Sequence, residues 1–247
     1  MKIIAELHTH SDEYCDHADA SIDAEVEEAK KQGFKFFATT NHGPMHDKDT
    51  PICFYLRNRR RKYDDITFLA GMEADIRDLK GGLDFAATDL LRLDFVIASL
   101  HEATIKYKYP DYTETLILTI ANPGVDCLGH IARDMRYNYE LEPVLRAVKE
   151  NGKLIEFNNW SIYGYKMEET CGRVMDLAAE MGVECIVTSD AHDTDRIGQH
   201  AQVIKMLEER SFPEELIVNA DEDRMSAFLA RRKEEKEKAR AALFNLL

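Results

Sequence analysis

The sequence predicts an α/β fold in which parallel strands alternate with helices and close into a barrel. Short apolar runs of the kind found in buried strands alternate along the chain with amphipathic stretches of helical period. A side chain able to bind a metal ion or a substrate ends each of the seven clearest runs, and successive ones lie 28 to 34 residues apart. That interval is one βα unit, and the carboxyl ends of all strands in a parallel barrel open on one face. We therefore expect the seven side chains to meet in a single pocket.

The composition favours one domain that is not secreted. The chain has 247 residues, 45% of them hydrophobic, and no linker rich in Pro, Gly or Ser divides it. We expect a single barrel domain over residues 1–247, of which 222–247 form a charged helical extension. There is no apolar leader and no apolar run of about eighteen residues, and the cysteines form no Cys-x-x-Cys pair. These absences predict a cytoplasmic protein that does not enter membranes.

The formal charge of −14 disfavours duplex nucleic acid and anionic membranes as partners. An anionic substrate stays open, because divalent cations in one pocket would reverse the local sign of the field. The one dense basic run, Arg57 to Lys62, is expected to be a solvated helix face, with guidance of a nucleotide as the alternative. Lys106 and Lys108 are expected to be solvated loop cations.

The expected elements follow the order of a barrel. Strands are predicted at 3–7, 34–40, 66–73, 95–101, 125–130, 153–158 and 185–190, with a weaker eighth at 216–220. Helices are predicted at 22–32, 141–150, 169–181 and 199–210. Ser21 opens the first helix and Gly33 closes it, which are the residue types that cap helices. Gly81 and Gly82 predict a hairpin turn after the third strand.

Most of the residues that end the seven strands are metal-ligand types. They are His8, His42, Glu73, His101, His130, Asn158 and Asp190. His10 and His192 lie two residues after His8 and Asp190, so each pair projects to one side of an extended chain. His17, in the loop after the first strand, completes a set of nine imidazoles and carboxylates.

Nine such ligands are too many for one ion. Imidazole and carboxylate together suit zinc, manganese and iron, and at about three to four protein ligands each they would serve two to three divalent ions. Zinc is the expected ion, and Glu73 is placed to bridge two of them. Water between two such ions ionises near neutral pH, so the expected reaction is hydrolysis by a metal-bound hydroxide.

The same residues occur as an ordered set of motifs. The set is His8-Thr-His10, His17, Thr40-Asn41-His42-Gly43-Pro44, Gly71-Met-Glu73, His101-Glu102, His130, Glu156-Phe-Asn158-Asn159 and Ser189-Asp190-Ala-His192. It resembles the PHP family, named for polymerase and histidinol phosphatase domains, over nearly the whole chain. The length and the pair of asparagines make the chain most similar to the stand-alone YcdX-type phosphatases of that family.

The resemblance implies a distorted seven-stranded (β/α) barrel whose trinuclear centre hydrolyses phosphate esters. It assigns the ligands to three ions: His8, His10, Glu73 and Asp190 to the first, Glu73, His101 and His130 to the second, and His17, His42 and His192 to the third. Two departures stand out. Asn41 replaces the usual Asp before the strand-two histidine, which could weaken the orientation of His42, and Ile-Ala-Arg follows His130 in place of a Pro-Gly turn.

Further residues are expected near the pocket mouth. Arg133 is expected to clamp a substrate phosphate and to act in catalysis beside Glu73, Asp190 and His192, while Arg136 is a weaker candidate. Trp160 is expected to form the floor of the pocket.

The paired asparagines Asn158 and Asn159 would order substrate or a metal-bound water, or else cap backbone amides. Cys15 is expected to be an unengaged loop thiol, and His200 a surface residue. His46 would line the mouth or donate a proton to the leaving group if it has a role at all.

The favoured function is a metal-dependent phosphatase acting on a small phosphomonoester. The alternatives are a phosphodiesterase or exonuclease at the same cluster, an amidohydrolase-like enzyme, and a non-catalytic metal-binding regulatory protein. An amidohydrolase-like barrel also has a His-x-His motif at its first strand. It normally has a bridging lysine at the end of strand four, where this chain has His101. A small phosphorylated molecule is the expected partner, and the apolar end of the tail is expected to dock on the barrel or on another subunit of a homo-oligomer.

Overall fold

The structure is a computed structural model that describes residues 1–46, 50–105, 109 and 111–244. Within these residues, seven strands form one sheet in which all neighbours are parallel and the spatial order follows the sequence. They are β1 (Ala5–Glu6), β2 (Phe36–Thr39), β3 (Thr67–Asp75), β4 (Phe95–Ser99), β5 (Cys127–Leu128), β6 (Leu154–Asn158) and β7 (Cys185–Thr188). Each overlaps a predicted strand.

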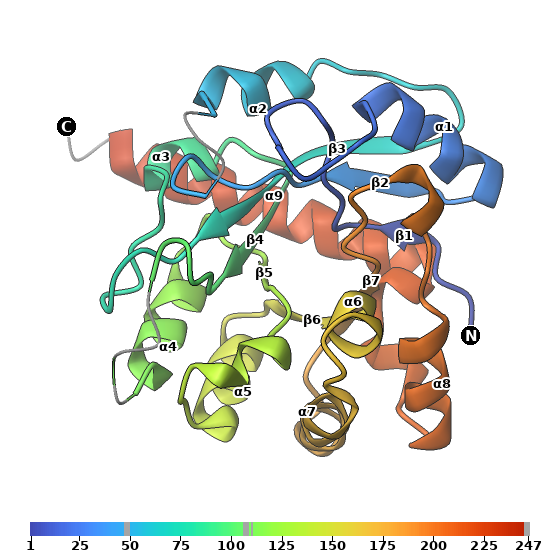
Figure 1. Cartoon of the computed structure of the whole chain (residues 1–247). Coiled ribbons are helices and arrows are strands. Elements are labelled where there is room, and N and C mark those ends of the chain that lie inside the picture. The colour runs from blue at the N-terminus through green and yellow to red at the C-terminus, as the bar shows by residue number, and fades with distance from the viewer. Residues whose placement is uncertain (47–49, 106–108, 110, 245–247) are drawn as a thin grey trace.

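Helices surround the sheet, as Figure 1 shows. They are α1 (Ile22–Gln32), α2 (Ile52–Asn58), α3 (Ala87–Leu90), α4 (Thr113–Ala121), α5 (Leu141–Glu150), α6 (Asn159–Tyr163), α7 (Glu168–Met181), α8 (Ala201–Glu209) and α9 (Glu222–Phe244). The predicted helices correspond to α1, α5, α7 and α8 and differ from them by at most two residues at either end. As expected, Ser21 Oγ accepts a hydrogen bond from Ala24 N at the start of α1, and Gly33 ends it with φ of 82°.

The predicted hairpin after the third strand is confirmed. Ile76 and Leu83 pair in an antiparallel bridge, and Arg77 N donates to Gly82 O at 2.9 Å. Gly81 occupies the turn with φ of 70°, a conformation that favours glycine.

β1 and β7 close the sheet into a distorted barrel. Beyond the strand ends, His10 N donates to Ala191 O at 2.8 Å. Along β1 and β7 themselves, the side-chain amide of Asn219 lies between the two strands and bonds to both. Its Nδ2 donates to Ala5 O at 2.9 Å and to Val187 O at 2.7 Å. Its Oδ1 accepts from Val187 N at 3.0 Å. The distorted seven-stranded barrel is therefore confirmed.

The predicted eighth strand at 216–220 is wrong. This segment forms two 3₁₀ turns, η3 (Glu214–Leu216) and η4 (Val218–Ala220). Its apolar Ile217 and Val218 are buried, which explains the strand-like pattern. The chain turns here to insert the amide of Asn219 between β1 and β7, so no extended run is left for regular pairing.

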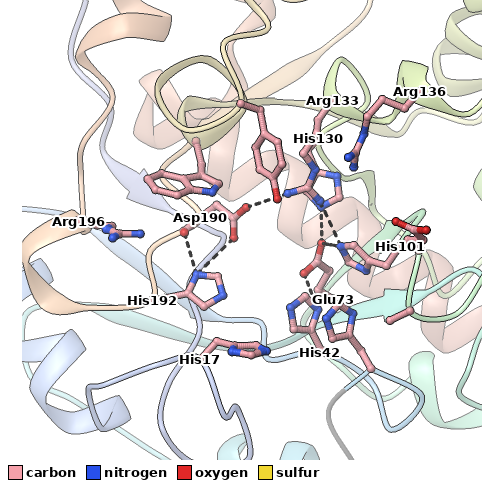
Figure 2. Close-up of a pocket in the computed structure, with 15 residues that line it drawn as sticks. His17, His42, Glu73, His101, His130, Arg133, Arg136, Asp190, His192 and Arg196 are labelled. Atoms are coloured by element: carbon pink, nitrogen blue, oxygen red, sulfur yellow. Dashed lines mark hydrogen bonds and ion pairs between the residues drawn. The ribbon is translucent and has the colours of Figure 1, made fainter.

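The carboxyl ends of the strands open on one pocket, drawn in Figure 2. The third strand is longer than predicted, because β3 continues two residues past Glu73 to Asp75. Residues two apart in a strand project to the same face, so Asp75 lies on the side of the sheet that carries Glu73.

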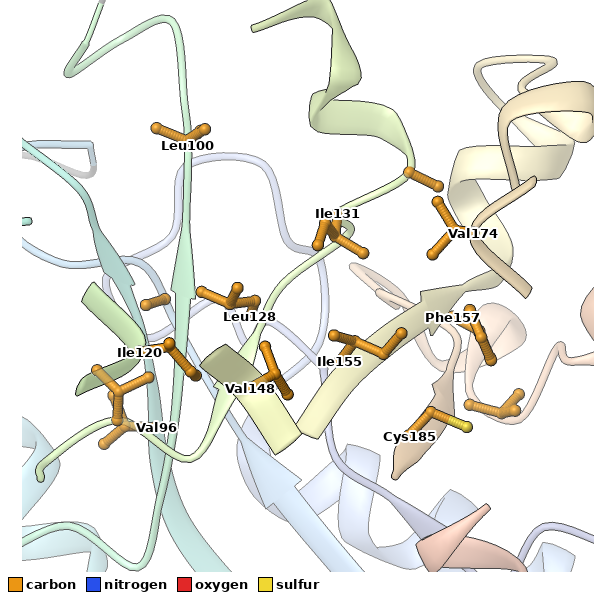
Figure 3. Close-up of a cluster of buried hydrophobic side chains, with 14 of the residues drawn as sticks. Val96, Leu100, Ile120, Leu128, Ile131, Val148, Ile155, Phe157, Val174 and Cys185 are labelled. Carbon is orange, nitrogen blue, oxygen red and sulfur yellow. The ribbon is translucent and has the colours of Figure 1, made fainter. Parts of the chain in front are cut away.

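The apolar core has two layers. The outer layer lies between the strands and their helices, and Figure 3 shows part of it with Val96, Ile120, Leu128, Val148, Ile155 and Val174. The inner layer fills the barrel and includes Leu7, Phe36, Leu69, Phe95, Ile97, Leu154 and Ile186. These layers hold the strands in register and so place the residues at their carboxyl ends.

α9 lies across the amino ends of the strands, away from the pocket. Met225 and Phe228 belong to the inner apolar layer. Arg232 Nε donates to Asp126 Oδ1 at 2.8 Å, and Lys236 Nζ binds Asp126 Oδ2. The exposed fractions of these three charged residues are 0 to 3%, so the helix is fastened by buried ion pairs as well as by apolar contacts.

The tail matches the expected charged helix over the part that the structure describes. The division into one domain over 1–247 with an extension at 222–247 stays a prediction. The predicted docking of the apolar end of the tail involves residues 245–247, which lie outside the described residues. Lys106 and Lys108 lie outside them as well. Within the described ranges, no helix is both long and apolar enough to cross a membrane.

Lys153, next to the buried ion pairs, gives a prediction for the pH dependence of stability. Burial lowers the pKa of Lys153 to about 7, even though Asp126 is near. Between pH 7 and pH 10.5, Lys153 is protonated in the unfolded chain and neutral in the folded one. The unfolded state therefore binds more protons, and the contribution of Lys153 makes the free energy of unfolding rise with pH.

Lys153→Met should therefore be more stable than the wild type near pH 7. This advantage should shrink by about 1.4 kcal/mol per pH unit as the pH rises. Urea unfolding of both proteins from about pH 7 to about pH 9 measures the difference, and parallel stability curves would contradict the prediction.

Candidate metal centre

Four buried side chains from β1, β3 and β7 or their ends form a cage. His8 Nε2 and His10 Nε2 lie 3.1 Å apart. Asp190 Oδ1 is 3.5 Å from the first and 3.3 Å from the second, and Glu73 Oε2 is 3.3 and 3.5 Å from them. Donor atoms at about 2.0 to 2.1 Å from a tetrahedral ion are about 3.3 Å apart. The ligand atoms of His8, His10 and Asp190 therefore form a group suited to one ion of the kind predicted from the sequence, and Glu73 borders this group.

Glu73 turns its second oxygen to another pair of histidines. Glu73 Oε1 lies 2.7 Å from His130 Nε2 and 3.4 Å from His101 Nε2. Arg133 Nη2 approaches the same two imidazoles, at 3.2 Å from His101 Nε2 and in contact with His130 Nε2. The two oxygens of Glu73 thus face two ligand groups, which is the arrangement that a bridging carboxylate needs.

The residues assigned to a third ion gather less tightly. His42 Nδ1 lies 2.9 Å from Glu73 Oε2, and the ring of His192 stacks on that of His10 with centres 4.2 Å apart. His17 lines the same pocket in Figure 2. Among the described residues, however, it belongs to no group whose ligand atoms all lie within 4.8 Å of one another. Its role as a ligand stays a prediction.

Cys15 is not the unengaged loop thiol that was expected. It is buried, and it offers a ligand atom within 4.8 Å of those of His10 and His192. The loop after β1 folds back over the pocket because Asp19 N donates to His192 O at 2.9 Å. This long-range contact brings the thiol inward.

Charge pairing prepares these groups to bind cations. Burial alone would raise the pKa of Glu73, but His8 and the neighbouring imidazoles hold it well below its usual value. The pKa of Asp190 is also lowered well below its usual value, since His8 and His10 outweigh the effect of burial. Burial and nearby imidazoles lower the pKa of His10. Glu73 and Asp190 are thus ionised and His10 is neutral, which are the forms that bind metal. Burial would lower the pKa of His8, but Glu156 and the other nearby carboxylates raise it well above its usual value, so a metal ion has to displace a proton there.

Glu156, which was quoted in a motif without a role, supports the first group. Its Oε1 accepts from His8 Nδ1 at 2.6 Å and from Thr188 Oγ1, and its Oε2 accepts from His130 N. Because His8 uses Nδ1 for this bond, its Nε2 is the atom that faces the cage. The sequence signal was the spacing of two residues between Glu156 and Asn158, which puts both on one face of β6.

Glu156→Gln should weaken metal binding about 10- to 100-fold, because a glutamine has one acceptor oxygen where the carboxylate offers two. Competition with a chromophoric zinc chelator measures the change. Glu150→Gln is the matched control, since Glu150 is exposed at the end of α5. Equal zinc affinity in the two variants would show that Glu156 does not orient His8.

Asp75 was missed because the third strand was predicted to end at Glu73. Its Oδ1 accepts from His101 Nδ1 at 2.7 Å, so it fixes the ring whose Nε2 faces Glu73. A carboxylate behind a ligating histidine is a common device in metal sites.

Asn41 takes a role that an aspartate could not. Its Oδ1 accepts from Ser11 N at 2.8 Å, while its Nδ2 donates to Ser11 O at 3.1 Å and to Glu13 O at 2.6 Å. A carboxylate cannot donate these two bonds. The departure from the family pattern thus fastens the loop after β1.

The two asparagines at the end of strand six both accept hydrogen bonds from backbone amides, which was the second of the two expected roles. The ordering of substrate or of a metal-bound water by them stays a prediction. Asn158 Oδ1 caps α6 by accepting from Ser161 N at 3.0 Å, while its Nδ2 donates to Asp190 Oδ2 at 3.1 Å. Asn159 Oδ1 accepts from Val203 N at 3.1 Å, so it holds α8. Asn158 therefore orients a candidate ligand as well as a helix.

His200 is not on the surface, and that prediction is wrong. Only 4% of it is exposed, and its Nε2 lies 2.8 Å from Glu6 Oε2. Glu6 is fully buried in β1 and needs a partner, which α8 supplies from far along the chain. Nothing local in the sequence signals this pairing.

The pocket has a volume of about 510 Å³ and carries three arginines at its rim. Arg133 and Arg136 both approach the ring of Tyr165, at 5.3 and 5.5 Å from its centre. Arg196 lies over Trp160 at 4.4 Å, and Trp160 lines the pocket as expected. In Figure 2, Arg136 and Arg196 lie on opposite sides of the opening.

The basic run from Arg57 to Lys62 does not line this pocket among the described residues. Arg61 pairs with Glu13 at 3.0 Å and with Asp23 at 2.8 Å. The charge of Arg61 is therefore partly neutralised. Because α2 ends at Asn58, Arg57 is the one basic residue of this run that lies on the helix, so the predicted helix face is wrong for the rest of the run.

The match to a family model decides the relationship. The model described as PHP domain matches residues 6–160, which is more than half of the chain. The chain belongs to the PHP family. A protein named "Probable phosphatase" from Acetivibrio thermocellus is 36% identical and covers 95% of this chain and 98% of its own length. One of that name from Caldicellulosiruptor saccharolyticus is 39% identical over 86% of this chain and 90% of its own length.

Solved structures agree on the fold of this PHP protein. Histidinol phosphate phosphatase from Lactococcus lactis, solved with zinc, L-histidinol and phosphate, aligns with a TM-score of 0.60 at 18% identity over 85% of this chain and 94% of its own. A chain of archaeal ribonuclease P, solved with mature tRNA, aligns with a TM-score of 0.58 at 10% identity. The alignment covers 94% of this chain and 92% of that one. The resemblance to the PHP family and the barrel fold are both confirmed.

Proposed function

We propose that this PHP protein is a metal-dependent phosphoesterase that hydrolyses a small phosphomonoester. The observation that carries the proposal is the position of Glu73, whose two oxygens face two groups of imidazole and carboxylate ligands. Relatives of nearly full length are named as probable phosphatases, so the enzyme class is that of a phosphatase.

The donor set fits two to three divalent ions, with zinc first and manganese or iron as alternatives. The ligands we propose are His8, His10, His17, His42, Glu73, His101, His130, Asp190 and His192. Such ions supply a water nucleophile at neutral pH and offset charge on the phosphoryl oxygens. The Lactococcus lactis enzyme was solved with zinc.

The chain's own groups position the ester. Arg133 is 6% exposed and lines the pocket beside His101 and His130. Its planar guanidinium can hold two phosphate oxygens together. Asp190 and His192, on the opposite side in Figure 2, keep the other ligands in place. We assign Arg133, Glu73, Asp190 and His192 to catalysis on this basis.

A monoester suits the pocket better than a polynucleotide. The cavity of about 510 Å³ has the size of a small-molecule site. In the basic run that could lead a strand to it, Arg61 is paired with Glu13 and Asp23. A phosphodiesterase, an exonuclease or a metal-binding regulator without turnover are the alternatives that the assay below separates. Cytoplasmic location and assembly into a homo-oligomer stay predictions.

The test uses protein stripped of metal and reloaded with zinc or manganese. Hydrolysis is measured as release of p-nitrophenol from p-nitrophenyl phosphate and from bis(p-nitrophenyl) phosphate, and as release of nucleotides from single-stranded DNA. The proposal expects turnover of the monoester that depends on added metal and exceeds the other two. Faster cleavage of the diester or of DNA would overturn it, and full metal loading without any turnover would favour the regulator.

Arg133→Ala should raise KM for the monoester about 10- to 100-fold, because a charge-assisted pair of hydrogen bonds to phosphate is lost. Arg133→Lys should recover only part of this loss, since lysine keeps the charge without the planar fork. Steady-state kinetics measures both variants, with Arg136→Ala as the comparison at the exposed rim. An unchanged KM in Arg133→Ala would remove this residue from the binding site.

A further inference from the structure

The rim of the pocket is cationic in a chain that is acidic as a whole. Apart from the residues proposed as metal ligands, the charged residues that line the pocket in the described part of the chain are Arg133, Arg136 and Arg196 against one carboxylate, Glu102. The whole chain has a formal charge of −14. The proposed function uses Arg133 for the phosphate group. The other two guanidinium groups are therefore left for another part of the substrate.

The three arginines lie in two places. Arg133 and Arg136 both approach the ring of Tyr165, at 5.3 and 5.5 Å from its centre. Arg196 comes from the loop after β7, and Figure 2 shows it across the opening from Arg136. Arg136 thus adjoins the arginine that is assigned to the phosphate, whereas Arg196 faces a different part of the same pocket.

Arg196 is held in place and still has donors to offer. Its guanidinium lies over the indole of Trp160, 4.4 Å from the ring centre, and its Nε lies 3.0 Å from Asp193 Oδ2. Its Nη1 and Nη2 make no hydrogen bond within the described residues, and 40% of its side chain is exposed. Asp193 is not among the described residues that line the pocket, so a ligand there meets the guanidinium rather than the carboxylate. The planar group is thus available to bind a carboxylate or a phosphate.

The loop that carries Arg196 is fastened to the barrel. Glu6 is fully buried in β1, and its Oε2 accepts from Gly198 N at 3.3 Å and lies 2.8 Å from His200 Nε2. On the other side of Arg196 in the chain, Asp193 Oδ1 accepts from Arg196 N at 3.0 Å. The guanidinium is therefore presented from a fixed segment, as recognition of one group of a ligand requires.

We propose that Arg196, supported by Trp160, binds a second anionic group of the substrate. The preferred substrate is then a phosphomonoester whose leaving group carries a carboxylate or a phosphate. This inference rests on the proposed function, because it places the phosphate to be cleaved at the metal centre beside Arg133. A charge-assisted pair of hydrogen bonds favours binding by about 10- to 100-fold, so an anionic leaving group should be preferred by that factor.

The test compares aryl phosphates that differ only in the group opposite the phosphate on the ring. They are 4-methylphenyl phosphate and its 4-carboxymethyl, 4-phosphonomethyl and 4-aminomethyl counterparts, and kcat/KM is measured for each with zinc-loaded protein. We expect one or both anionic groups to raise kcat/KM about 10- to 100-fold over the methyl ester, and the amine to lower it. The faster of the two anionic esters identifies the second group. Equal kcat/KM for the methyl ester and both anionic esters would overturn the proposal.

Arg196→Gln should bring kcat/KM of the anionic esters down to that of the methyl ester. Arg196→Lys should keep part of the preference, since lysine keeps the charge without the planar fork. Arg146→Gln is the matched control, because it removes the same charge from an exposed position on α5 outside the pocket, and it should keep the full preference. A preference that is lost in Arg136→Gln but unchanged in Arg196→Gln would overturn the assignment to Arg196.

Phosphonates, which resist hydrolysis, separate this inference from the proposed function. Calorimetry with zinc-loaded protein compares (4-methylphenyl)phosphonate with its 4-carboxymethyl and 4-phosphonomethyl counterparts. The wild type should bind an anionic counterpart about 10- to 100-fold more tightly than the methyl compound, and Arg196→Gln should bind them equally. A protein without turnover would refute the proposed function and leave this difference in affinity. Equal affinities in the wild type would overturn the inference about Arg196, whatever the turnover.

Discussion

Glu73→Ala should abolish phosphatase activity, with a fall in kcat/KM of at least about a thousandfold. The residue is fully enclosed among His8, His10, His101 and His130, and each of its oxygens faces a different ligand group. Its removal therefore weakens two ion positions together. Elemental analysis of protein purified without added metal, together with steady-state kinetics on p-nitrophenyl phosphate, measures both effects.

Glu102→Ala is the control for this experiment, because Glu102 lies on the same pocket wall but in none of the ligand groups found among the described residues. We expect about two to three ions per chain in the wild type and in Glu102→Ala, and a sharp drop in Glu73→Ala. A Glu73→Ala protein that keeps its full metal content would show that this carboxylate is not a bridge.

Asp126→Ala should lower the free energy of unfolding by about 3 to 5 kcal/mol. The carboxylate is fully buried and binds Arg232 and Lys236 of α9, so its loss leaves two buried cations without their counter-charge. For a chain of this length, the melting temperature should fall by about 10 °C. Urea and thermal unfolding measure the change.

Glu142→Ala provides the comparison for a salt bridge of similar length at the surface. Glu142 pairs with Arg146 at 2.6 Å, but both side chains are more than half exposed. Its loss should change the free energy of unfolding by less than about 0.5 kcal/mol. Similar effects of the two substitutions would mean that α9 is not held to the barrel by Asp126.

The sequence was most informative where a residue's role follows from its distance along the chain. The spacing of one ligand per βα unit predicted the barrel, and residues at the ends of different strands, such as His8, Glu73 and Asp190, do meet. Ser21 and Gly33 marked a helix correctly because a cap acts on its immediate neighbours.

Residues that act through a distant partner were not predictable. His200 is buried because Glu6 needs a partner 194 residues away. Asp75, the last residue of β3, and Glu156, inside β6, support ligands that other strands supply, so their roles depend on partners far along the chain. Cys15 turns inward because of a loop contact across the chain. The contacts of His200 and Cys15 leave no periodic pattern in the sequence.

The amide of Asn219 makes the closure of the barrel between β1 and β7 depend on a residue that is synthesised long after β1. Its contact with Ala5 spans 214 residues, so β1 emerges from the ribosome long before the group that joins it to β7. Until then both strands keep unsatisfied backbone groups along that edge, where other chains can pair with them. Nascent and truncated chains are thus the forms of this protein most open to misassembly.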